Sequence, residues 1–272
     1  MNTFGSDGFT VGSDGKVNNS SDTYISYNWR ANGGSASNSD GATSSTVQAS
    51  PGGAFSIVTY TGFAGASGTS TVGHGMGIAP NLIIFKSRTR SSAWWTAVPG
   101  VLSSQSHFLQ LNATNTPLDL SSYGTISAPT TSVFSINGVD GIGGESANYV
   151  AYCFANVEGF CQVGTYKGNG DDDGAFTYTG FRPAVILIRE YGAADNWLLY
   201  NNKTLGYNLD SAGNAQVYPD TNVDEENQAS RAIDILSNGF KIRTSNATGN
   251  ASDGDYVYLA LAHNPFKYAT AR

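Results

Sequence analysis

A segment in which tyrosine alternates with apolar residues occurs three times along this chain, and few folds can accommodate such a repetition. The copies begin at Tyr24, Tyr149 and Tyr256, so successive copies are 125 and 107 residues apart. Each follows by 15 or 16 residues a short segment that opens with phenylalanine: Phe9-Thr10-Val11, Phe134-Ser135-Ile136 and Phe240-Lys241-Ile242. Internal similarity at spacings of this order predicts that the chain is built from related structural units.

The stretches between these copies also match. Three pairs of segments correspond at offsets of 103 to 106 residues: Thr59-Tyr60-Thr61-Gly62 with Thr165-Tyr166-Lys167-Gly168, Ala79–Lys86 with Arg182–Arg189, and Trp94 with Trp197. The first unit holds 19 additional residues in Asn32–Gly53, a run rich in Gly, Ser, Asn and Ala that predicts an inserted loop. We therefore expect unit one to span residues 1–125, unit two residues 126–236, and closing strands residues 237–272.

The pattern within the repeats is that of β-strands. In the tyrosine segments every second residue is large and apolar, ending at Trp29, Phe154 and Leu261, so this face is expected to lie in the core and Trp29 to be a core residue. The continuous apolar runs Leu82–Phe85 and Val185–Ile188 predict strands that are buried on both sides. Helix is expected in one place, at Asp224–Arg231, which begins with acidic residues as helices favour.

These observations predict an all-β fold: one pseudo-symmetric antiparallel β-sandwich, lectin-like, made of the two related units. The final strands would pair back near the first ones and close the sheets. Two separate domains with a boundary near Pro129–Thr131 are the alternative.

Composition narrows the class of protein further. Charged residues are only 13% of the chain while Gly, Ser, Thr and Asn make up about two fifths, which excludes a coiled coil or helical bundle. A net charge of −7 disfavours binding to nucleic acid. No apolar run is long enough to enter a membrane, and the N-terminus lacks the features of a Sec signal. Cys153 and Cys161 are expected to be buried thiols, although a disulfide across a turn at Asn156–Gly159 remains open.

The sequence offers few groups for catalysis. His74 lies in a glycine-rich loop and is expected to bond to backbone, and His263 is expected to end the last strand. No Gly-x-Ser-x-Gly motif is present, and five glutamates offer little for a glycosidase, so we expect no enzyme. The acidic run of Asp171, Asp172 and Asp173 is expected to be a solvated hairpin tip, with Ca²⁺ binding as the weaker alternative; no other cofactor is expected.

Aromatic side chains outside the repeat are the candidate binding residues, because exposed rings with polar neighbours are suited to sugars. Trp94 and Trp197 occupy matching positions and are expected to be structural, whereas Trp95 matches Leu198 and breaks the repeat. The candidate glycan contacts are Trp95, Tyr123, Tyr191, Tyr207 and Tyr218.

Several of these stretches resemble a β-rich repeat module of unassigned function that occurs at the C-termini of bacteriophage tail fibres and other virion-associated proteins. The resemblance covers nearly the whole chain, and the stretches that carry it are Gly8–Ser13 with Tyr24, Thr71–Gly77 with Ala79-Pro80, Tyr149–Ala155, Tyr178–Ala184, and Leu236–Arg243. It implies a role on the virion surface, with host surface glycans as ligand, but carries no catalytic residues. An N-terminal attachment region and a trimeric shaft, both usual in a tail fibre, are not recognisable here.

The resulting hypothesis is a non-catalytic receptor-binding domain of a phage tail fibre, assembled in the host cytoplasm. It would form a homotrimer, contact other virion proteins, and bind a host-cell polysaccharide or receptor by weak multivalent contacts. Recognition would fall on loops that break the repeat: Asn32–Gly53, Phe63–Ile78, Pro99–Tyr123 and Lys203–Ser230. A capsid decoration or other structural virion protein is the first alternative, and a polysaccharide depolymerase is the second.

Overall fold

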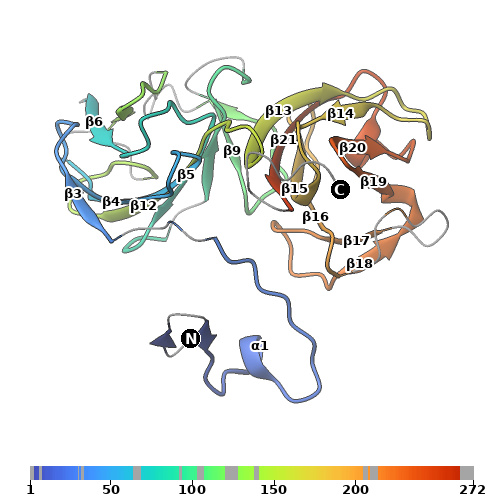
Figure 1. Cartoon of the computed structure of the whole chain (residues 1–272), viewed down its shortest axis with the longest axis horizontal. Helices are drawn as coiled ribbons and strands as arrows, with labels where there is room; N and C mark the ends of the chain where they lie inside the picture. The colour runs from blue at the N-terminus through green and yellow to red at the C-terminus, as the bar shows by residue number, and fades with distance from the viewer. Residues whose placement is uncertain are drawn as a thin grey trace. The chain divides into compact units, whose positions relative to one another are not determined.

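The computed structural model describes residues 3–5, 8–29, 31, 34–63, 69–91, 94–102, 107–119, 128–137, 141–204, 208 and 214–263. The chain separates into two compact units, Met1–Arg30 and Ala31–Arg272. The expected all-β fold is confirmed, because the regular structure of the described residues is almost entirely strand and every pairing between named strands is antiparallel (Figure 1). Within the described residues, no helix is both long enough and apolar enough to span a membrane.

The first unit is small. It contains a two-stranded hairpin of β1 (Thr3–Phe4) and β2 (Phe9–Thr10), followed by the four-residue helix α1 (Gly15–Asn18). The segment Tyr24–Trp29 is not a strand, and Trp29 is 44% exposed, so its predicted core position is wrong. A strand needs neighbours for its backbone N–H and C=O groups, and no strand pairing among the described residues includes this segment.

The second unit begins with module one, which we define as residues 36–154. Its large sheet, called sheet one, has eight strands, and the pair β6–β11 lies over one face. The order across sheet one is β10 (Leu118–Asp119), β9 (His107–Gln110), β8 (Trp95–Ala97), β7 (Leu82–Ser87), β12 (Asn148–Phe154), β5 (Phe55–Thr61), β4 (Ser45–Ala49) and β3 (Ala36–Asn38). The covering pair is β6 (Thr69–Gly73) and β11 (Val133–Asn137).

Module two, residues 161–262, repeats this plan. Its sheet two has six strands and is covered by a three-stranded sheet that we call the cover sheet. The order across sheet two is β13 (Cys161–Lys167), β21 (Asp255–Ala262), β15 (Pro183–Glu190), β16 (Leu198–Asn201), β17 (Asn214–Val217) and β18 (Glu226–Gln228). The cover sheet is β14 (Phe176–Tyr178), β20 (Gly239–Ile242) and β19 (Ile233–Leu236), and the helix α2 (Ala247–Asn250) precedes β21.

Three buried clusters hold these layers together. The first lies between sheet one and β6–β11, and the third lies between sheet two and the cover sheet. The middle cluster joins the two large sheets, with Phe55 and Phe154 from sheet one and Leu187 and Leu259 from sheet two. The strands β12 and β21 are therefore buried on both faces, which explains their nearly continuous apolar character.

The strand pairings place the repeat differently from the sequence prediction. Each tyrosine strand closes its own module: β12 lies between β5 and β7, and β21 lies between β13 and β15. The chain passes from one module to the next after Phe154, not near residue 125 or Pro129–Thr131. We had expected the last strands to pair back near the first ones. Instead, β21 pairs on both edges within module two, with β13 and β15.

Two further expectations were wrong. Part of Asn32–Gly53, expected to be a loop, forms β3 and β4, which extend sheet one by pairing with β5. The helix expected at Asp224–Arg231 is instead β18 followed by a single 3-10 turn at Ala229–Arg231. The partner strand β17 overrides the helical signal, since it pairs with β18 at three positions.

Candidate functional site

The outer face of the cover sheet carries two exposed aromatic side chains. Residues alternate along β14: Thr177 faces the core, whereas Phe176 and Tyr178 point outward and are 47% and 66% exposed. Phe176 is paired with Lys241 on β20, and Tyr178 with Gly239. A side chain at Gly239 would collide with the backbone of Thr177 and approach the Phe176 ring, so glycine keeps this surface open beneath the aromatic pair.

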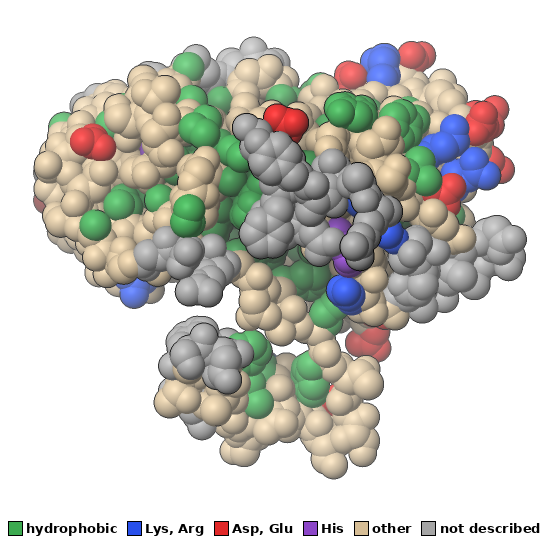
Figure 2. All heavy atoms as spheres, viewed as in Figure 1, with side chains coloured by type: hydrophobic (Ala, Val, Ile, Leu, Met, Phe, Trp, Pro, Cys, Tyr) green, Lys and Arg blue, Asp and Glu red, His purple; other side chains and the backbone are tan. Residues whose placement is uncertain are grey.

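A row of charged groups lies beside the aromatic pair. Lys241 is flanked by Phe176 on one side and by Asp234 of β19 on the other, in cross-strand register. The Lys241 Nζ lies 2.8 Å from Asp173 Oδ1, and Arg243 lies 3.6 Å from the same oxygen and 3.5 Å from Asp234 Oδ2. The hydrogen bond and charge of Lys241 lower the pKa of Asp173 from its ordinary value, so that carboxylate stays charged in mildly acidic solution. In Figure 2, basic and acidic side chains gather at the upper right, the part of the view where Figure 1 places the cover sheet.

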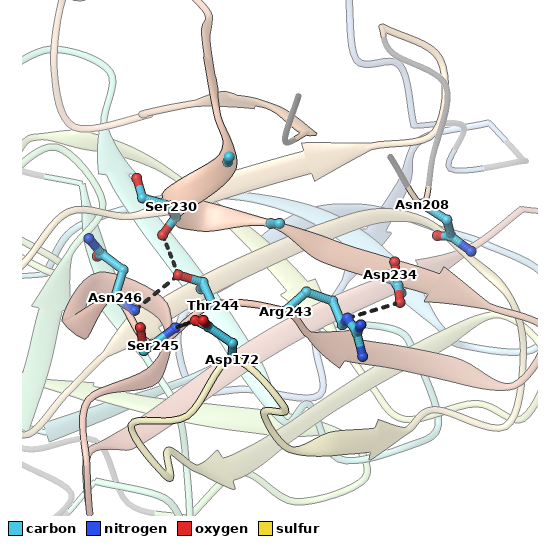
Figure 3. Close-up of a pocket in the computed structure, with 10 residues that line it drawn as sticks. Asp172, Asn208, Ser230, Asp234, Arg243, Thr244, Ser245 and Asn246 are labelled. Atoms are coloured by element: carbon cyan, nitrogen blue, oxygen red, sulfur yellow. Dashed lines mark hydrogen bonds and ion pairs between the residues drawn. The ribbon is translucent and has the colours of Figure 1, made fainter. Parts of the chain in front are cut away.

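Next to this row the surface opens into a polar cavity of about 690 Å³ (Figure 3). Asp234 and Arg243 belong to both the charged row and the cavity wall. The remaining lining residues are small or polar: Asp172, Asn208, Ala229, Ser230, Ala232, Thr244, Ser245 and Asn246. The cavity thus presents carboxylates, a guanidinium, hydroxyls and amides at one surface.

The walls of the cavity are held by hydrogen bonds. Asp172 Oδ1 accepts from the backbone N–H of Ser245 (2.7 Å), which joins the loop before β14 to the segment after β20. Asn250 is fully buried, and its side-chain nitrogen lies 2.8 Å from the carbonyl oxygens of Asp171 and Thr244 and from the side-chain oxygen of Asn169. One buried amide therefore fixes both segments that frame the cavity.

Together these features suit a ligand with both polar and apolar faces. The rings of Phe176 and Tyr178 can pack on an apolar face, and the lining groups can donate and accept hydrogen bonds at its hydroxyls. No covalent or acid–base step is required of any lining residue for such binding.

The acidic run is not a hairpin tip, because β13 and β14 belong to different sheets and the run crosses between them. Its carboxylates also have different partners. Asp171 Oδ1 accepts from the backbone N–H of Asp173 (2.8 Å), Asp172 from that of Ser245, and Asp173 pairs with Lys241. Among the described residues, no group of three or more His, Cys, Asp or Glu is placed to hold a metal ion.

Three of the five aromatic residues predicted from the sequence lie within the described residues, and the structure places them apart. Trp95 is partly buried and packs edge-on against Phe108, with ring centroids 6.3 Å apart. Tyr191 is partly buried against the middle cluster. Tyr123 and Tyr207 lie outside the described residues. The candidates that the structure describes, Trp95, Tyr191 and Tyr218, pack against three different clusters and do not share one surface.

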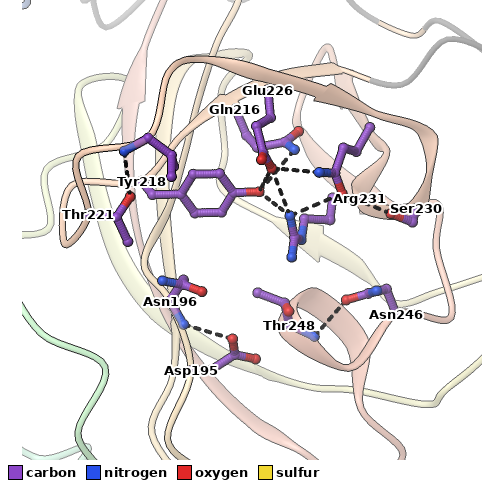
Figure 4. A network of polar contacts seen from close by, with 12 residues as sticks. Asp195, Asn196, Gln216, Tyr218, Thr221, Glu226, Ser230, Arg231, Asn246 and Thr248 are labelled. Atoms are coloured by element: carbon purple, nitrogen blue, oxygen red, sulfur yellow. Dashed lines mark hydrogen bonds and ion pairs between the residues drawn. The ribbon is translucent and has the colours of Figure 1, made fainter.

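The prediction that Tyr218 is a glycan contact is wrong, since only 4% of its side chain is exposed. Its hydroxyl belongs to a polar network (Figure 4), where it donates to Glu226 Oε2 (2.8 Å) and receives a hydrogen bond from Gln216 Nε2 (3.2 Å). The Arg231 guanidinium contacts the same hydroxyl and lies 5.2 Å from the centre of the Tyr218 ring. Burial is the main cause of the raised pKa of Tyr218. The network ties β17, β18 and the following turn together, which is a structural role.

Phe176 and Tyr178 were missed by the sequence analysis, which named other aromatic residues outside the repeat as its candidates. The repeat could have found them. Thr177 pairs with Phe240 as Val72 pairs with Phe134, so the residues on either side of Thr177 correspond to Thr71 and Gly73 in module one. Phe176 and Tyr178 therefore differ from their counterparts Thr71 and Gly73, just as Trp95 differs from its counterpart Leu198.

Predictions for the histidines and cysteines fared better. His74 is buried and bonds to backbone as expected: its Nδ1 accepts from Met76 N (3.2 Å) and its Nε2 lies 3.2 Å from the Thr130 carbonyl oxygen. His263 follows the end of β21. Cys153 and Cys161 are buried free thiols in different clusters, and burial raises both pKa values, that of Cys161 to about 12.

Comparison with known proteins places the chain in a family. Residues 1–265 match the model of a domain of unknown function, DUF7483. The chain belongs to this family. No curated protein and no solved structure matches the chain. The family's description names no activity, so the function has to be argued from the residues.

Proposed function

We propose that this DUF7483 protein is a non-catalytic adhesion module of a phage virion that binds host surface polysaccharide through the cover sheet of module two. The observation that carries the proposal is that the exposed rings of Phe176 and Tyr178 lie on the same face of the cover sheet as Asp234, which lines the polar cavity. Sugars present apolar C–H faces and many hydroxyls, and this surface offers a complement to each. The virion location rests on the resemblance of the sequence to tail-fibre modules.

The shape of the site favours weak and repeated contacts over tight binding of one molecule. Two rings and an open cavity bury little of a ligand, whereas pockets for small molecules enclose most of it. Presentation on a homotrimer would raise the apparent affinity by avidity without a deeper site. Tail-fibre receptor binding fits such a surface better than capsid decoration, because a fixed lattice contact has no need of an open polar cavity.

Binding of labelled full-length protein to host cells, in competition with their extracted surface polysaccharide, tests the proposal. We expect saturable binding that the polysaccharide displaces, with no release of reducing ends. In the double variant Phe176→Ser, Tyr178→Ser the affinity should fall about tenfold or more, since two stacking contacts are lost. Val223→Ser removes another exposed apolar side chain of module two and should bind as the unaltered protein does.

The alternatives predict different results. Release of reducing ends would identify a depolymerase. Absence of binding, also after the chain is fused to a trimerising segment, would overturn the proposal in favour of a structural virion protein. Equal binding by the double variant and Val223→Ser would refute the assignment of the site. Thermal unfolding of each variant confirms that differences in binding do not arise from unfolding.

A further inference from the structure

The N-terminal unit reproduces in miniature the part of module two that precedes β21. A two-stranded hairpin comes first in both, β1–β2 in one and β19–β20 in the other. A four-residue helix follows, and each is capped by a side chain: Asp14 accepts from Lys16 N in α1, and Asn246 accepts from Thr248 N in α2, both at 3.0 Å. Asp14 and Asn246 are 232 residues apart, the same offset as between Tyr24 and Tyr256.

The tyrosine that begins each strand is held in the same way in both places. The Tyr24 hydroxyl accepts from the backbone N–H of Asn19 (2.8 Å) and donates to the carbonyl of Gly15 (2.9 Å). The Tyr256 hydroxyl accepts from the backbone N–H of Ala251 (2.7 Å) and contacts the carbonyl of Ala247. In each case the partners lie five and nine residues before the tyrosine. The hydrogen bonds that hold the start of the tyrosine segment in module two are therefore also present in the N-terminal unit.

The surroundings of the tyrosine segment differ between the copies. In module two, β21 inserts between β13 and β15, and the Tyr256 ring stacks on Tyr166 at 4.7 Å and 5°. In module one, β12 inserts between β5 and β7, and the Tyr149 ring stacks on Tyr60 at 5.5 Å and 19°. Tyr60 and Tyr166 each belong to a Thr-Tyr-x-Gly segment, so both slots share one recognisable feature.

The corresponding N-terminal side chains lie at the surface. Tyr24, Ile25 and Trp29 are 50%, 41% and 44% exposed. Their counterparts are buried: Tyr149 and Tyr256 are 0% exposed, and Trp29 corresponds to Phe154 and Leu261, which lie in the middle cluster. Among the described strands, the two pairs that accept a tyrosine strand, β5–β7 and β13–β15, already hold β12 and β21.

We propose that Tyr24–Trp29 is a donor strand that completes a further strand pair of the repeat's own type, one that is not among the strands the structure describes. The partner is a pair of antiparallel strands that leaves the width of one strand between them. One of the two carries a Thr-Tyr-x-Gly segment whose tyrosine stacks on Tyr24. Backbone hydrogen bonds on both edges supply the affinity, and the side chains on alternate positions supply the specificity, as in strand addition generally.

The sequence of the donor specifies its partner more closely. Ser26 and Asn28 occupy the positions of Ala151 and Cys153 in β12, both 0% exposed. A buried amide needs hydrogen-bond partners, so the strand pair that accepts this segment provides a polar group opposite Asn28.

A fusion of the full-length chain tests the inference. A second copy of residues 155–232, which contains β13 and β15, is placed ahead of Met1 so that Tyr24–Trp29 can take the place of β21. Hydrogen–deuterium exchange at residues 24–29 should slow by a factor on the order of 100 relative to the unaltered chain. The variant Asn28→Cys, which restores the residue found in β12, should slow exchange further, whereas Ser13→Cys, whose counterpart Ser245 is exposed, should not.

A matched control carries the β21 sequence in the same fusion: Ile25→Val, Ser26→Tyr, Tyr27→Leu, Asn28→Ala and Trp29→Leu. Protection of residues 24–29 in both fusions supports the proposal. Protection with the β21 sequence alone would overturn it, because the N-terminal segment would then lack strand character of this type. Protection in neither would also overturn it, because the hairpin and α1 would then not be equivalent to β19–β20 and α2.

Discussion

Val72 in module one and Thr177 in module two occupy the same place in the repeat, because each pairs across its covering sheet with a buried phenylalanine, Phe134 or Phe240. Both side chains face a core, and both are buried. One residue to either side, the modules differ completely. Module one has Thr71 and Gly73 at positions where module two has Phe176 and Tyr178.

The difference extends to the charges. Lys241, which pairs with Phe176, corresponds to Ser135 of module one, which pairs with Thr71. Figure 2 shows few charged side chains on the left of the view, where Figure 1 places β3, β4 and β6. Packing restricts the residues that face the core, while the outward positions are free to vary. A difference between two copies of one fold therefore indicates where function has been added.

The sharpest test of this equivalence is to remove the same ring from both cores. Phe134 lies edge-on to Tyr60 and Phe85, and Phe240 lies edge-on to Tyr166 and Tyr258, in both cases with centroids 5.2 to 6.1 Å apart. Phe134→Ala and Phe240→Ala should each lower the free energy of unfolding by about 3–5 kcal/mol, since each leaves a cavity in a buried cluster. Chemical denaturation measures both. A cost below about 2 kcal/mol for one variant, with about 3–5 kcal/mol for the other, would refute the equivalence of the two cores.

The two tryptophans at matching positions, Trp94 and Trp197, have different surroundings in the two modules. Trp197 is 1% exposed, and its Nε1–H donates to the carbonyl of Gln110 (2.8 Å), a bond from module two to module one. Trp94 is partly buried; it stacks on Tyr152, and Lys86 lies 5.5 Å from its centre. Trp197→Phe should cost about 2–3 kcal/mol in unfolding free energy, and Trp94→Phe about 1 kcal/mol or less. Equal costs in thermal or denaturant unfolding would contradict this asymmetry.

The sequence was sufficient for the elements whose pattern depends on burial. Alternation predicted β12 and β21, the apolar runs predicted the buried strands β7 and β15, and offsets of 103 to 106 residues related the two modules. Trp29 shows the limit of this reasoning. Its alternation is as regular as that of β12, but burial also requires two flanking strands, and pattern alone does not reveal whether they are present.

The candidate site was not predicted because the sequence does not show which face of a short strand is open to solvent. Phe176 and Tyr178 lie on β14, a three-residue strand at the edge of the cover sheet, where one face is open to solvent. The cavity depends on Asp172, Ser245 and other residues that are distant in the sequence and are joined by hydrogen bonds. Such long-range contacts leave no local pattern, so their assembly could be seen only in the structure.

A smaller difference between the modules concerns pH. His74 of module one occupies the place of Thr179, so only module one carries a titratable side chain at the end of this strand. Burial lowers the pKa of His74 from its ordinary value near 6.5, although the Thr130 carbonyl and Asp40 oppose the shift. The unfolded chain therefore takes up the proton at higher pH than the folded chain does. Stability should be complete above about pH 6.5 and should fall as the pH decreases from there towards the folded pKa.

The variant His74→Gln retains a donor and an acceptor without the titration, so the free energy of unfolding should depend less on pH between 8 and 5. The slope it removes cannot exceed about 1.4 kcal/mol per pH unit, the value for one proton. His263→Gln is the matched control: burial lowers that pKa too, but the ring is only partly buried and should contribute little. A steeper pH dependence in His74→Gln than in the unaltered protein would contradict the assignment, because His74 would then be stabilised in its charged form.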